Sequence, residues 1–394
     1  MDHVMTSYAR LPITFERGEG VWLWDDKGNK YLDAVAGVAV NGLGHCHPKL
    51  VAAIREQAGK LIHTSNLYNI ALQEKLAARL CELSGMDNVF FCNSGAEANE
   101  TAIKLARKYG NERGVTNPAI VVMEGSFHGR TLAALSASGS RKAQAGFEPL
   151  VQGFVRVPYN DFEAVETVAR NDPSIVAVLA EVIQGESGVN LARIEYLQAL
   201  RKLCDEKGWL MMIDEVQTGI GRTGKWFGHQ HAGILPDVMP LAKGLGGGVP
   251  IGACSARGAA AKLFKPGSHG STFGGTPLMC AASLATLQAM QDEKMLDNAV
   301  RVGEFIRAKV REALGRHPSV VDIRGQGLMI GIELDRPCGD IVKQGMAKGV
   351  LINVAGDTTV RLVPPLIITE TEASYLLGVL IPLIQEFVAQ PKAA

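Results

Sequence analysis

The feature that most constrains the fold is an alternation of short apolar runs with helix-like segments between about residues 50 and 280. Apolar runs of about four to eight residues that end in glycine or polar residues predict strands buried on both faces. Strands that alternate with helices form a mostly parallel sheet with helices on both sides. The strands predicted for this sheet are residues 89–92, 119–123, 175–181, 210–214 and 238–241.

The two ends of the chain predict a second, smaller unit. Residues 21–33 contain two aromatic-rich runs around the turn 26–29, a pattern typical of a hairpin. A helical stretch begins near residue 281, and predicted strands at 320–323, 328–334, 351–354 and 360–363 precede a final helix over 370–388. The sequence therefore predicts an α/β protein with a large domain over residues 50–280 and a smaller α+β domain over 281–394. Residues 1–49 are expected to form an N-terminal segment of the smaller domain.

Composition excludes several classes of partner. Lys+Arg and Asp+Glu both number 40, so neither nucleic acid nor an anionic membrane is expected to bind. No uninterrupted apolar run reaches the roughly 20 residues of a membrane span, and the first residues lack the pattern of a signal peptide. Seven cysteines without paired spacing indicate free thiols and a cytoplasmic protein. The segment His45-Cys46-His47 has no second cluster to complete a metal site, so a loop is expected there.

A carboxylate and a lysine are predicted at one edge of the large sheet. Asp214 lies at the carboxyl end of the strand 210–214, where open α/β sheets bind their ligands. Lys243 follows the next predicted strand in a glycine-rich loop. One reading is a buried ion pair, because a buried carboxylate is costly unless a cation meets it. The other is a site for pyridoxal phosphate (PLP), which needs a lysine for its Schiff base and an aspartate that keeps the ring nitrogen protonated.

Polar motifs follow two other predicted strands. Ser94 opens a helix after the strand 89–92, where exposed backbone N–H groups could hold a phosphate. The alternative is a helix cap in which Ser94 and Glu97 form a capping box. After the strand 119–123, Phe127 could stack on a flat ring and Arg130 could clamp a carboxylate. Core packing and surface charge are the alternatives for these two residues taken singly.

Acidic residues recur at consecutive strand ends, namely Glu124, Glu181 or Glu186, and Asp214. Stability alone seldom clusters carboxylates, so their grouping favours a functional site.

Three further residues add to this group. Ser271 and Thr272 offer hydroxyl groups for phosphate contact, although the same pattern also fits a plain turn. Arg361, inside the apolar run 360–363, requires a carboxylate partner from the protein or from a substrate.

Together these motifs resemble the class III PLP-dependent aminotransferases. The motifs are residues 93–99, 126–131, 214–219, 243–244 and 271–275, and the ordered match runs from about Pro12 to the final helix. The resemblance implies the PLP-dependent transferase fold of type I and a homodimer with shared active sites.

The resemblance also implies a role for each candidate residue. Lys243 is expected to carry PLP and then to move the proton during transfer, while Asp214 pairs with the ring nitrogen. The other expected cofactor contacts are Ser94, Gly95 and Ala96 at the phosphate, Phe127 against the ring, Gln217 at the phenolic oxygen, and Thr272 at the phosphate of the neighbouring subunit. The expected substrate contacts are Arg130 at the donor carboxylate, Ser271 near the substrate, Arg361 at the α-carboxylate of 2-oxoglutarate, and Glu186 as the alternating partner of Arg361.

Residues 40–45 and 360–366 are most similar to class members that use N2-acetyl-L-ornithine. The expected reaction moves the terminal amine of this donor to 2-oxoglutarate and gives N-acetyl-L-glutamate 5-semialdehyde and L-glutamate, a step of arginine biosynthesis. Succinyl-diaminopimelate, succinylornithine, ornithine and 4-aminobutyrate stay open as donors. A PLP-binding protein without turnover is the alternative from another class, and the intact set of Lys243, Asp214 and Arg361 argues against it. A racemase or aminomutase on the same fold is a third possibility.

Overall fold

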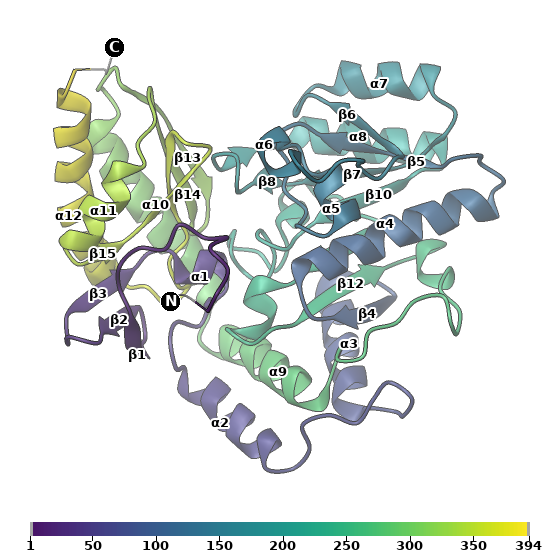
Figure 1. Ribbon diagram of the computed structural model, residues 1–394, viewed down its shortest axis with the longest axis horizontal. Helices are drawn as coiled ribbons and strands as arrows, with labels where there is room; N and C mark the ends of the chain where they lie inside the picture. Colours follow the sequence, from purple (N-terminus) through teal and green to yellow (C-terminus); the bar gives the residue numbers. More distant parts are fainter. Residues whose placement is uncertain (1–2, 392–394) are drawn as a thin grey trace.

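A seven-stranded sheet forms the centre of the larger half of the molecule (Figure 1). The computed structural model describes residues 3–391; residues 1, 2 and 392–394 of the expected small domain lie outside this range. The strand order is β4-β12-β11-β10-β7-β5-β6. Its strands are β4 (Asn88–Cys92), β5 (Ala119–Met123), β6 (Phe154–Val157), β7 (Ile175–Glu181), β10 (Leu210–Asp214), β11 (Val238–Leu241) and β12 (Gly252–Ala256).

The predicted parallel sheet is confirmed, with one antiparallel strand. β12 runs antiparallel to β11 and β4, whereas the other neighbours pair in parallel. All five predicted strands are present, but β6 and β12 were not predicted. The residues of β12 are Gly-Ala-Cys-Ser-Ala, which lack the β-branched side chains that signal a strand.

Helices cover both faces of this sheet because its strands are apolar on both sides. In β10, Leu210 and Met212 pack in the same apolar cluster as α4 (Gly95–Glu112). Met211 and Ile213 point to the opposite face and pack with α8 (Ile194–Lys207). The other elements of this half are α2 (Pro48–Ala58), α3 (Ala71–Ser84), α5 (Leu132–Ala137), α6 (Arg141–Gln144), α7 (Phe162–Asn171), β8 (Ile183–Gln184), β9 (Asn190–Leu191), η1 (Gly228–His231), η2 (Lys243–Gly246), η3 (Ala260–Lys262) and α9 (Pro277–Asp292).

The two ends of the chain meet in the smaller half. A sheet of order β1-β2-β3-β15 contains the predicted hairpin and one strand from the C-terminal part of the chain. Its strands are β1 (Phe15–Glu19), β2 (Trp22–Asp25), β3 (Lys30–Asp33) and β15 (Val350–Leu351), and the helix α1 (Ala36–Ala39) follows β3. β15 pairs in parallel with β3, which joins Val350 to Leu32.

A second sheet of the smaller half has the order β13-β14-β17-β16. Its elements are β13 (Val320–Gln326), β14 (Met329–Leu334), β16 (Asn353–Ala355) and β17 (Thr359–Leu362), with the helices α10 (Met295–Leu314), α11 (Asp340–Ala347) and α12 (Glu370–Ala389). The single strand predicted at 351–354 is instead divided between β15 and β16, which belong to different sheets.

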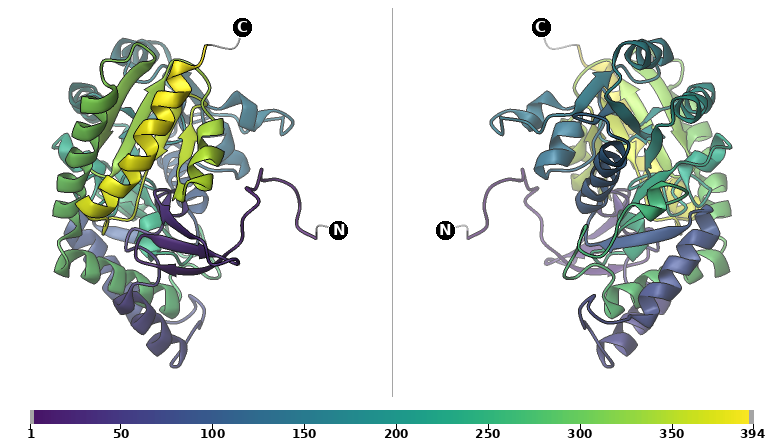
Figure 2. Two further views of the ribbon diagram at one scale, coloured as in Figure 1. Left: turned by 90° about the vertical axis from the view of Figure 1, so that its left-hand side faces the viewer. Right: turned by 90° about the vertical axis from the view of Figure 1, so that its right-hand side faces the viewer.

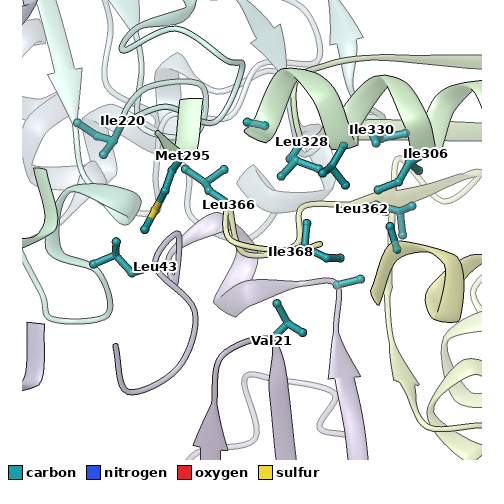
Figure 3. Packing of buried hydrophobic residues seen from close by; sticks show 14 of the residues in the cluster. Val21, Leu43, Ile220, Met295, Ile306, Leu328, Ile330, Leu362, Leu366 and Ile368 are labelled. Atoms are coloured by element: carbon teal, nitrogen blue, oxygen red, sulfur yellow. The ribbon is translucent and has the colours of Figure 1, made fainter. Parts of the chain in front are cut away.

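One apolar core joins the N-terminal segment, the large half and the C-terminal half. Figure 3 shows Val21 and Leu43 from the N-terminal segment, Ile220 from the loop after β10, and Leu366 and Ile368 from the C-terminal half. All of these side chains are buried in the same cluster. The larger and smaller halves therefore pack as one body around the edge of the large sheet.

Helix α12 is long and apolar enough to cross a membrane by length and composition alone, with a mean hydropathy of 1.4. Its buried residues, among them Leu376, Leu380 and Ile384, lie in the core cluster. The helix packs against α10 and α11 (Figure 1). These contacts are those of a core helix.

The segment His45-Cys46-His47 is a loop, as predicted. His45 bonds through Nε2 to the Asp33 carboxylate at 2.8 Å, whereas His47 Nε2 lies 3.2 Å from the Glu293 carboxylate. Because the two histidines face different carboxylates, each has a structural role. Within residues 3–391, no group of three or more His, Cys, Asp or Glu side chains could hold a metal ion.

Candidate active site

A cavity of about 440 Å³ opens at the carboxyl ends of β4, β5, β7, β10 and β11. It is lined by most of the predicted site residues, namely Ser94, Gly95, Ala96, Phe127, Arg130, Asp214, Gln217 and Lys243. Four further lining residues are Asn99, His128, Glu181 and Val216. The cavity therefore collects residues from motifs that are far apart in the sequence.

Three donors hold the Asp214 carboxylate in one orientation. Asn99 Nδ2 donates to Oδ2 at 2.8 Å, and the Val216 N–H donates to Oδ1 at 2.9 Å. His128 Nδ1 lies 2.8 Å from Oδ2. An ionised carboxylate only accepts hydrogen bonds, so this ring nitrogen carries the proton. Among the described residues no ion pair joins Asp214 to Lys243, so the reading of a simple buried pair is not supported.

The sequence predicted no role for Asn99 or His128, although both lie in the motifs 93–99 and 126–131. Both side chains are buried, and the Asn99 Oδ1 and His128 Nε2 atoms lack hydrogen-bond partners within the described chain. An asparagine in the interior of a helix could have indicated a hydrogen-bonding role, since a buried amide needs partners. The sequence could not reveal that this face of α4 lies over the end of β10.

Lys243 is the first residue of η2 and has a positive φ of 44°. Burial lowers the pKa of Lys243, against the opposing effect of the Glu186, Asp214 and Glu181 carboxylates. Within residues 3–391 no hydrogen bond or ion pair occupies its Nζ atom. A lysine with a lowered pKa, aimed into a cavity, is suited to act as a nucleophile and as a base.

Glu181 stands beside Asp214 because β7 and β10 pair in register at these two residues. Burial raises the pKa of Glu181 well above its usual value, and the neighbouring Asp214 charge adds to this effect. The Phe127 N–H donates to Glu181 Oε1 at 2.9 Å. Glu181 therefore keeps its proton to a higher pH than an ordinary glutamate does. The expected third acid, Glu124, is exposed and lies outside the cavity lining.

Arg361 is buried and meets a carboxylate of the protein. Its Nη1 donates to Glu186 Oε1 at 2.8 Å, to the Gly185 carbonyl at 2.8 Å and to Gln217 Oε1 at 3.2 Å. Gln217 Nε2 also reaches Glu186 Oε1 at 3.3 Å. Burial by itself would raise the pKa of Glu186, but Arg361 and then Lys243 lower it below the usual value. The pair is therefore fully charged.

The N-terminus of α4 lies at the cavity. Ser94 caps the helix by accepting from the Glu97 N–H at 3.2 Å, as predicted. The Glu97 carboxylate accepts from the Ser94 hydroxyl at 3.1 Å and from the Asn93 N–H at 2.7 Å, so the backbone bond of a capping box comes from the residue before Ser94. A Cβ at Gly95 would lie 2.7 Å from Val216 Cγ1, which requires glycine here. The N–H groups of Gly95 and Ala96 begin the helix and line the cavity.

The remaining predicted residues lie at the rim. The Arg130 guanidinium lies 5.5 Å from the centre of the Phe127 ring and is exposed. Ser271 Oγ accepts from Asn93 Nδ2 at 3.2 Å, next to the cavity wall. Thr272 is exposed and is absent from the cavity lining.

The residues around the cavity fit PLP by their chemistry. An amine without a partner, a carboxylate fixed at the end of β10, an aromatic ring and a helix N-terminus match the aldehyde, the ring nitrogen, the ring face and the phosphate. The family model of class III aminotransferases matches residues 4–384. The chain is a class III aminotransferase. Its cofactor is therefore PLP and its fold is the type I fold of PLP-dependent transferases, as the sequence predicted.

Known proteins similar to this aminotransferase include both sequences and solved structures. It is 60% identical to acetylornithine aminotransferase from Nitrosomonas europaea over 95% of each chain, and 50% identical to that from Caldanaerobacter subterraneus over 98% of each. The crystal structure of ornithine aminotransferase from Toxoplasma gondii superposes with a TM-score of 0.95 at 35% identity, covering 99% of this chain and 94% of that one. Acetylornithine aminotransferase from Elizabethkingia anophelis gives a TM-score of 0.87 at 36% identity, covering 98% and 97% of the two chains.

Proposed function

We propose that this aminotransferase moves the terminal amino group of N2-acetyl-L-ornithine to 2-oxoglutarate, giving N-acetyl-L-glutamate 5-semialdehyde and L-glutamate in arginine biosynthesis. The observation that carries the proposal is a pair of arginines at different depths beside Lys243. Arg130 is exposed at the rim, whereas Arg361 is buried and closed by Glu186. The choice of donor is supported by 50% and 60% identity to acetylornithine aminotransferases over nearly the whole chain.

Lys243 and Asp214, which both line the cavity, would perform the chemical step. Bound PLP supplies an aldehyde that condenses with amines and a ring that accepts the electron pair left on carbon. The Lys243 amine, whose pKa is lowered by burial, would remove the proton from the carbon that bears nitrogen and return it during transfer. Asp214, held by Asn99 and His128, keeps a proton on the ring nitrogen.

Other residues of the cavity would hold and orient the cofactor. Ser94, Gly95 and Ala96 bind the phosphate at the positive end of α4. Phe127 covers one face of the ring. Gln217, which already bridges Arg361 and Glu186, reaches the phenolic oxygen.

The two arginines would allow one cavity to bind two unlike substrates. Arg130 binds the carboxylate at the far end of the donor, with Ser271 close to the substrate. Arg361 stays paired with Glu186 while the donor reacts, because an open arginine near the reacting carbon would favour α-amino acids. When 2-oxoglutarate enters, its α-carboxylate replaces Glu186 on Arg361.

We also propose that the protein is a cytoplasmic homodimer in which each Thr272 reaches the cofactor phosphate of the other subunit. We propose a large domain over residues 50–280 and a small domain formed by 1–49 and 281–394. The boundary at residue 280 falls inside α9, which begins at Pro277. The site draws on both proposed domains, since Val40 of the N-terminal segment lines the cavity and Arg361 on β17 bonds to Gln217 of the cavity wall.

A donor panel tests the reaction. Acetylornithine, succinylornithine, succinyl-diaminopimelate, ornithine and 4-aminobutyrate are each supplied with 2-oxoglutarate, and glutamate formation is followed. We expect the highest kcat/KM for acetylornithine and no glutamate from the Lys243→Ala enzyme. A higher kcat/KM for ornithine or 4-aminobutyrate would reject the donor assignment. Cofactor binding without glutamate formation from any donor would indicate a non-catalytic binding protein or another PLP reaction.

Borohydride labelling tests the cofactor lysine. Reduction should attach PLP to a peptide that contains Lys243 and leave the exposed Lys225 unlabelled. Labelling at another lysine would refute the assignment of Lys243.

A further inference from the structure

Every backbone carbonyl group of the turn that carries Glu186 accepts a hydrogen bond. The turn spans residues 185–189, between the antiparallel strands β8 and β9. All five carbonyl oxygens accept a hydrogen bond, and four of these bonds come from the smaller half of the molecule. The donors are Arg361 Nη1 to Gly185, the Gly356 N–H to Glu186, Asn190 Nδ2 to Ser187, Arg324 Nη2 to Gly188 and Arg324 Nε to Val189.

Arg324 makes the largest share of these contacts. Its Nη2 donates to the Gly188 carbonyl at 2.6 Å and to Asn190 Oδ1 at 3.0 Å, and its Nε donates to the Val189 carbonyl at 3.0 Å. Its Nη1 pairs with the carboxylates of Glu333 and Asp322. The side chain is therefore held on one side by acids of its own sheet and on the other by the turn.

Arg324 and Arg361 belong to one row of residues across the sheet of the smaller half. Arg324 on β13 pairs with Gly331 on β14, which pairs with Arg361 on β17. Residues directly opposite on antiparallel strands point to the same face. A Cβ at Gly331 would lie 3.0 Å from Val189 Cβ and 3.3 Å from the Gly188 carbonyl oxygen. The turn therefore packs against Gly331, and Arg324 and Arg361 lie on either side of this glycine.

The backbone of the turn leaves little room for movement. Gly188 has a φ of +125°, and a Cβ there would lie 3.0 Å from Thr359 Oγ1. Val189 is fully buried with a φ of +58°, a conformation that persists only when the surroundings enforce it. By contrast, the Glu186 side chain is 35% exposed, against 2% for Arg361. Glu186 can therefore leave Arg361 by side-chain rotation while its backbone stays in place.

We propose that Arg324 is a positioning residue for substrate selection, which anchors the 185–189 turn so that Glu186 closes Arg361 whenever no α-carboxylate is bound. This inference rests on the proposed exchange between Glu186 and 2-oxoglutarate. Without Arg324 the turn moves away from Gly331 and Arg361. Arg361 then stays open to α-amino acids during the donor half-reaction. Arg324 touches neither substrate nor cofactor, so its effect reaches the reaction through Glu186.

The test uses Arg324→Gln in the cofactor-loaded enzyme, with Arg324→Lys as the conservative variant. Arg311→Gln is the matched control, because Arg311 donates to the Ile323 carbonyl of the same strand at 3.2 Å and does not reach the turn. Two quantities are measured: hydrogen exchange in the peptide 183–191, and the ratio of single-turnover kcat/KM for glutamate to that for the terminal-amine donor.

In Arg324→Gln we expect faster exchange in 183–191 and a ratio shifted toward glutamate by about tenfold, the scale of a lost charged hydrogen bond. Arg324→Lys should restore part of both, and Arg311→Gln should change neither. Unchanged exchange, or faster exchange with an unchanged ratio, would overturn the proposal. If Arg324→Gln does not fold, Gly331→Ala displaces the turn from the other side and must give the same two changes.

The same data separate this inference from the proposed function. If the wild-type enzyme does not use acetylornithine, the donor assignment fails, and the ratio is taken against whichever terminal amine reacts. If the enzyme uses acetylornithine but the ratio does not change in Arg324→Gln, the positioning role of Arg324 is rejected and the proposed reaction is unaffected.

Discussion

At the scale of single residues, the chemistry depends on how the protein treats two neighbouring carboxyl groups differently. Asp214 and Glu181 are register partners on β10 and β7. Asp214 receives bonds from Asn99, His128 and Val216, which stabilise its charge. Glu181 accepts a bond from the Phe127 N–H, but burial still raises its pKa. Adjacent acids whose environments differ in this way are a common feature of active sites.

Asp214→Asn should preserve the shape of the cavity and remove the negative charge. We expect the donor half-reaction to slow by about 10²–10⁴, the usual range for losing a group that controls proton transfer, while cofactor affinity changes far less. Stopped-flow spectroscopy and a PLP titration measure the two quantities. Asp237→Asn is the control, since Asp237 is paired with Arg201 and Arg257 away from the cavity. A rate near that of the wild type would make Asp214 merely structural.

Glu181 should affect the pH dependence of stability in the apoprotein. Its pKa is raised above 4.5, so the folded protein keeps this proton at a pH where the unfolded chain has released it. The free energy of unfolding therefore falls as pH rises above 4.5, until the folded-state pKa is passed. Glu181→Gln has no ionisable group at this position. Between pH 4.5 and the folded-state pKa of Glu181, its stability relative to the wild type should therefore rise by up to about 1.4 kcal/mol per pH unit.

Urea unfolding between pH 4 and 8 measures this gain. Glu206→Gln, whose side chain is 58% exposed, should show a nearly constant difference from the wild type over the same range. A constant difference for Glu181→Gln as well would mean that Glu181 is ionised in the folded protein.

At the scale of elements, Ser94 at the start of α4 is expected both to cap the helix and to bind the cofactor phosphate, and a pair of substitutions can separate these roles. Ser94→Ala removes a helix cap, which should lower stability by about 1 kcal/mol, and also removes a phosphate ligand. Thr369→Ala removes the corresponding cap of α12, where Thr369 and Glu372 form a capping box far from the cavity. We expect similar losses of stability in both variants, but weaker PLP binding only in Ser94→Ala. Equal PLP affinities would show that Ser94 is only a cap.

Local patterns were enough to predict the strands that support the site. β5, β7, β10 and β11 match the predicted ranges because each is a buried apolar run with a clear end. Asp214 and Lys243 follow β10 and β11, which are parallel neighbours, so their side chains meet at one edge. The strand ends could thus be placed from sequence once a parallel sheet was assumed.

Contacts between distant segments could not be predicted from those patterns. The need of Arg361 for a carboxylate was visible, but Glu186 lies 175 residues earlier and only the fold brings the two together. Asn99 reads as an ordinary helix residue until α4 is placed over β10. Roles of the other site residues came from the resemblance to a family, not from the residues themselves.

At the scale of the whole molecule, one surface has the exposed apolar side chains expected of a contact with a second copy of the chain. Leu61, Ile62, Leu67, Tyr68 and Phe273 are all exposed, with Leu67 at 86%. Their two loops are joined, since Asn66 Nδ2 donates to the carbonyls of Ser271 and Gly274 at 2.9 and 3.0 Å. Figure 2 shows the segment before β1 running outward from the body as well. Exposed apolar groups gathered in this way favour burial against another subunit.

Thr272 lies on that surface, which allows a complementation test of shared active sites. A dimer of one Thr272→Ala chain and one Lys243→Ala chain contains one complete site, made from Lys243 of the first and Thr272 of the second. At limiting PLP, its activity per intact Lys243 should exceed that of the Thr272→Ala homodimer. The measurement uses mixed dimers isolated through two different tags.

Thr276→Ala is the matched control for this test, because the Thr276 hydroxyl donates to the Ile62 carbonyl of its own chain. A mixed dimer of Thr276→Ala with Lys243→Ala should therefore gain nothing over the Thr276→Ala homodimer. If Thr272→Ala behaves in the same way, Thr272 acts within its own subunit and the sites are not shared. Full activity in a monomeric form would contradict the shared site independently, because in that case no residue of a second chain is needed to hold the cofactor.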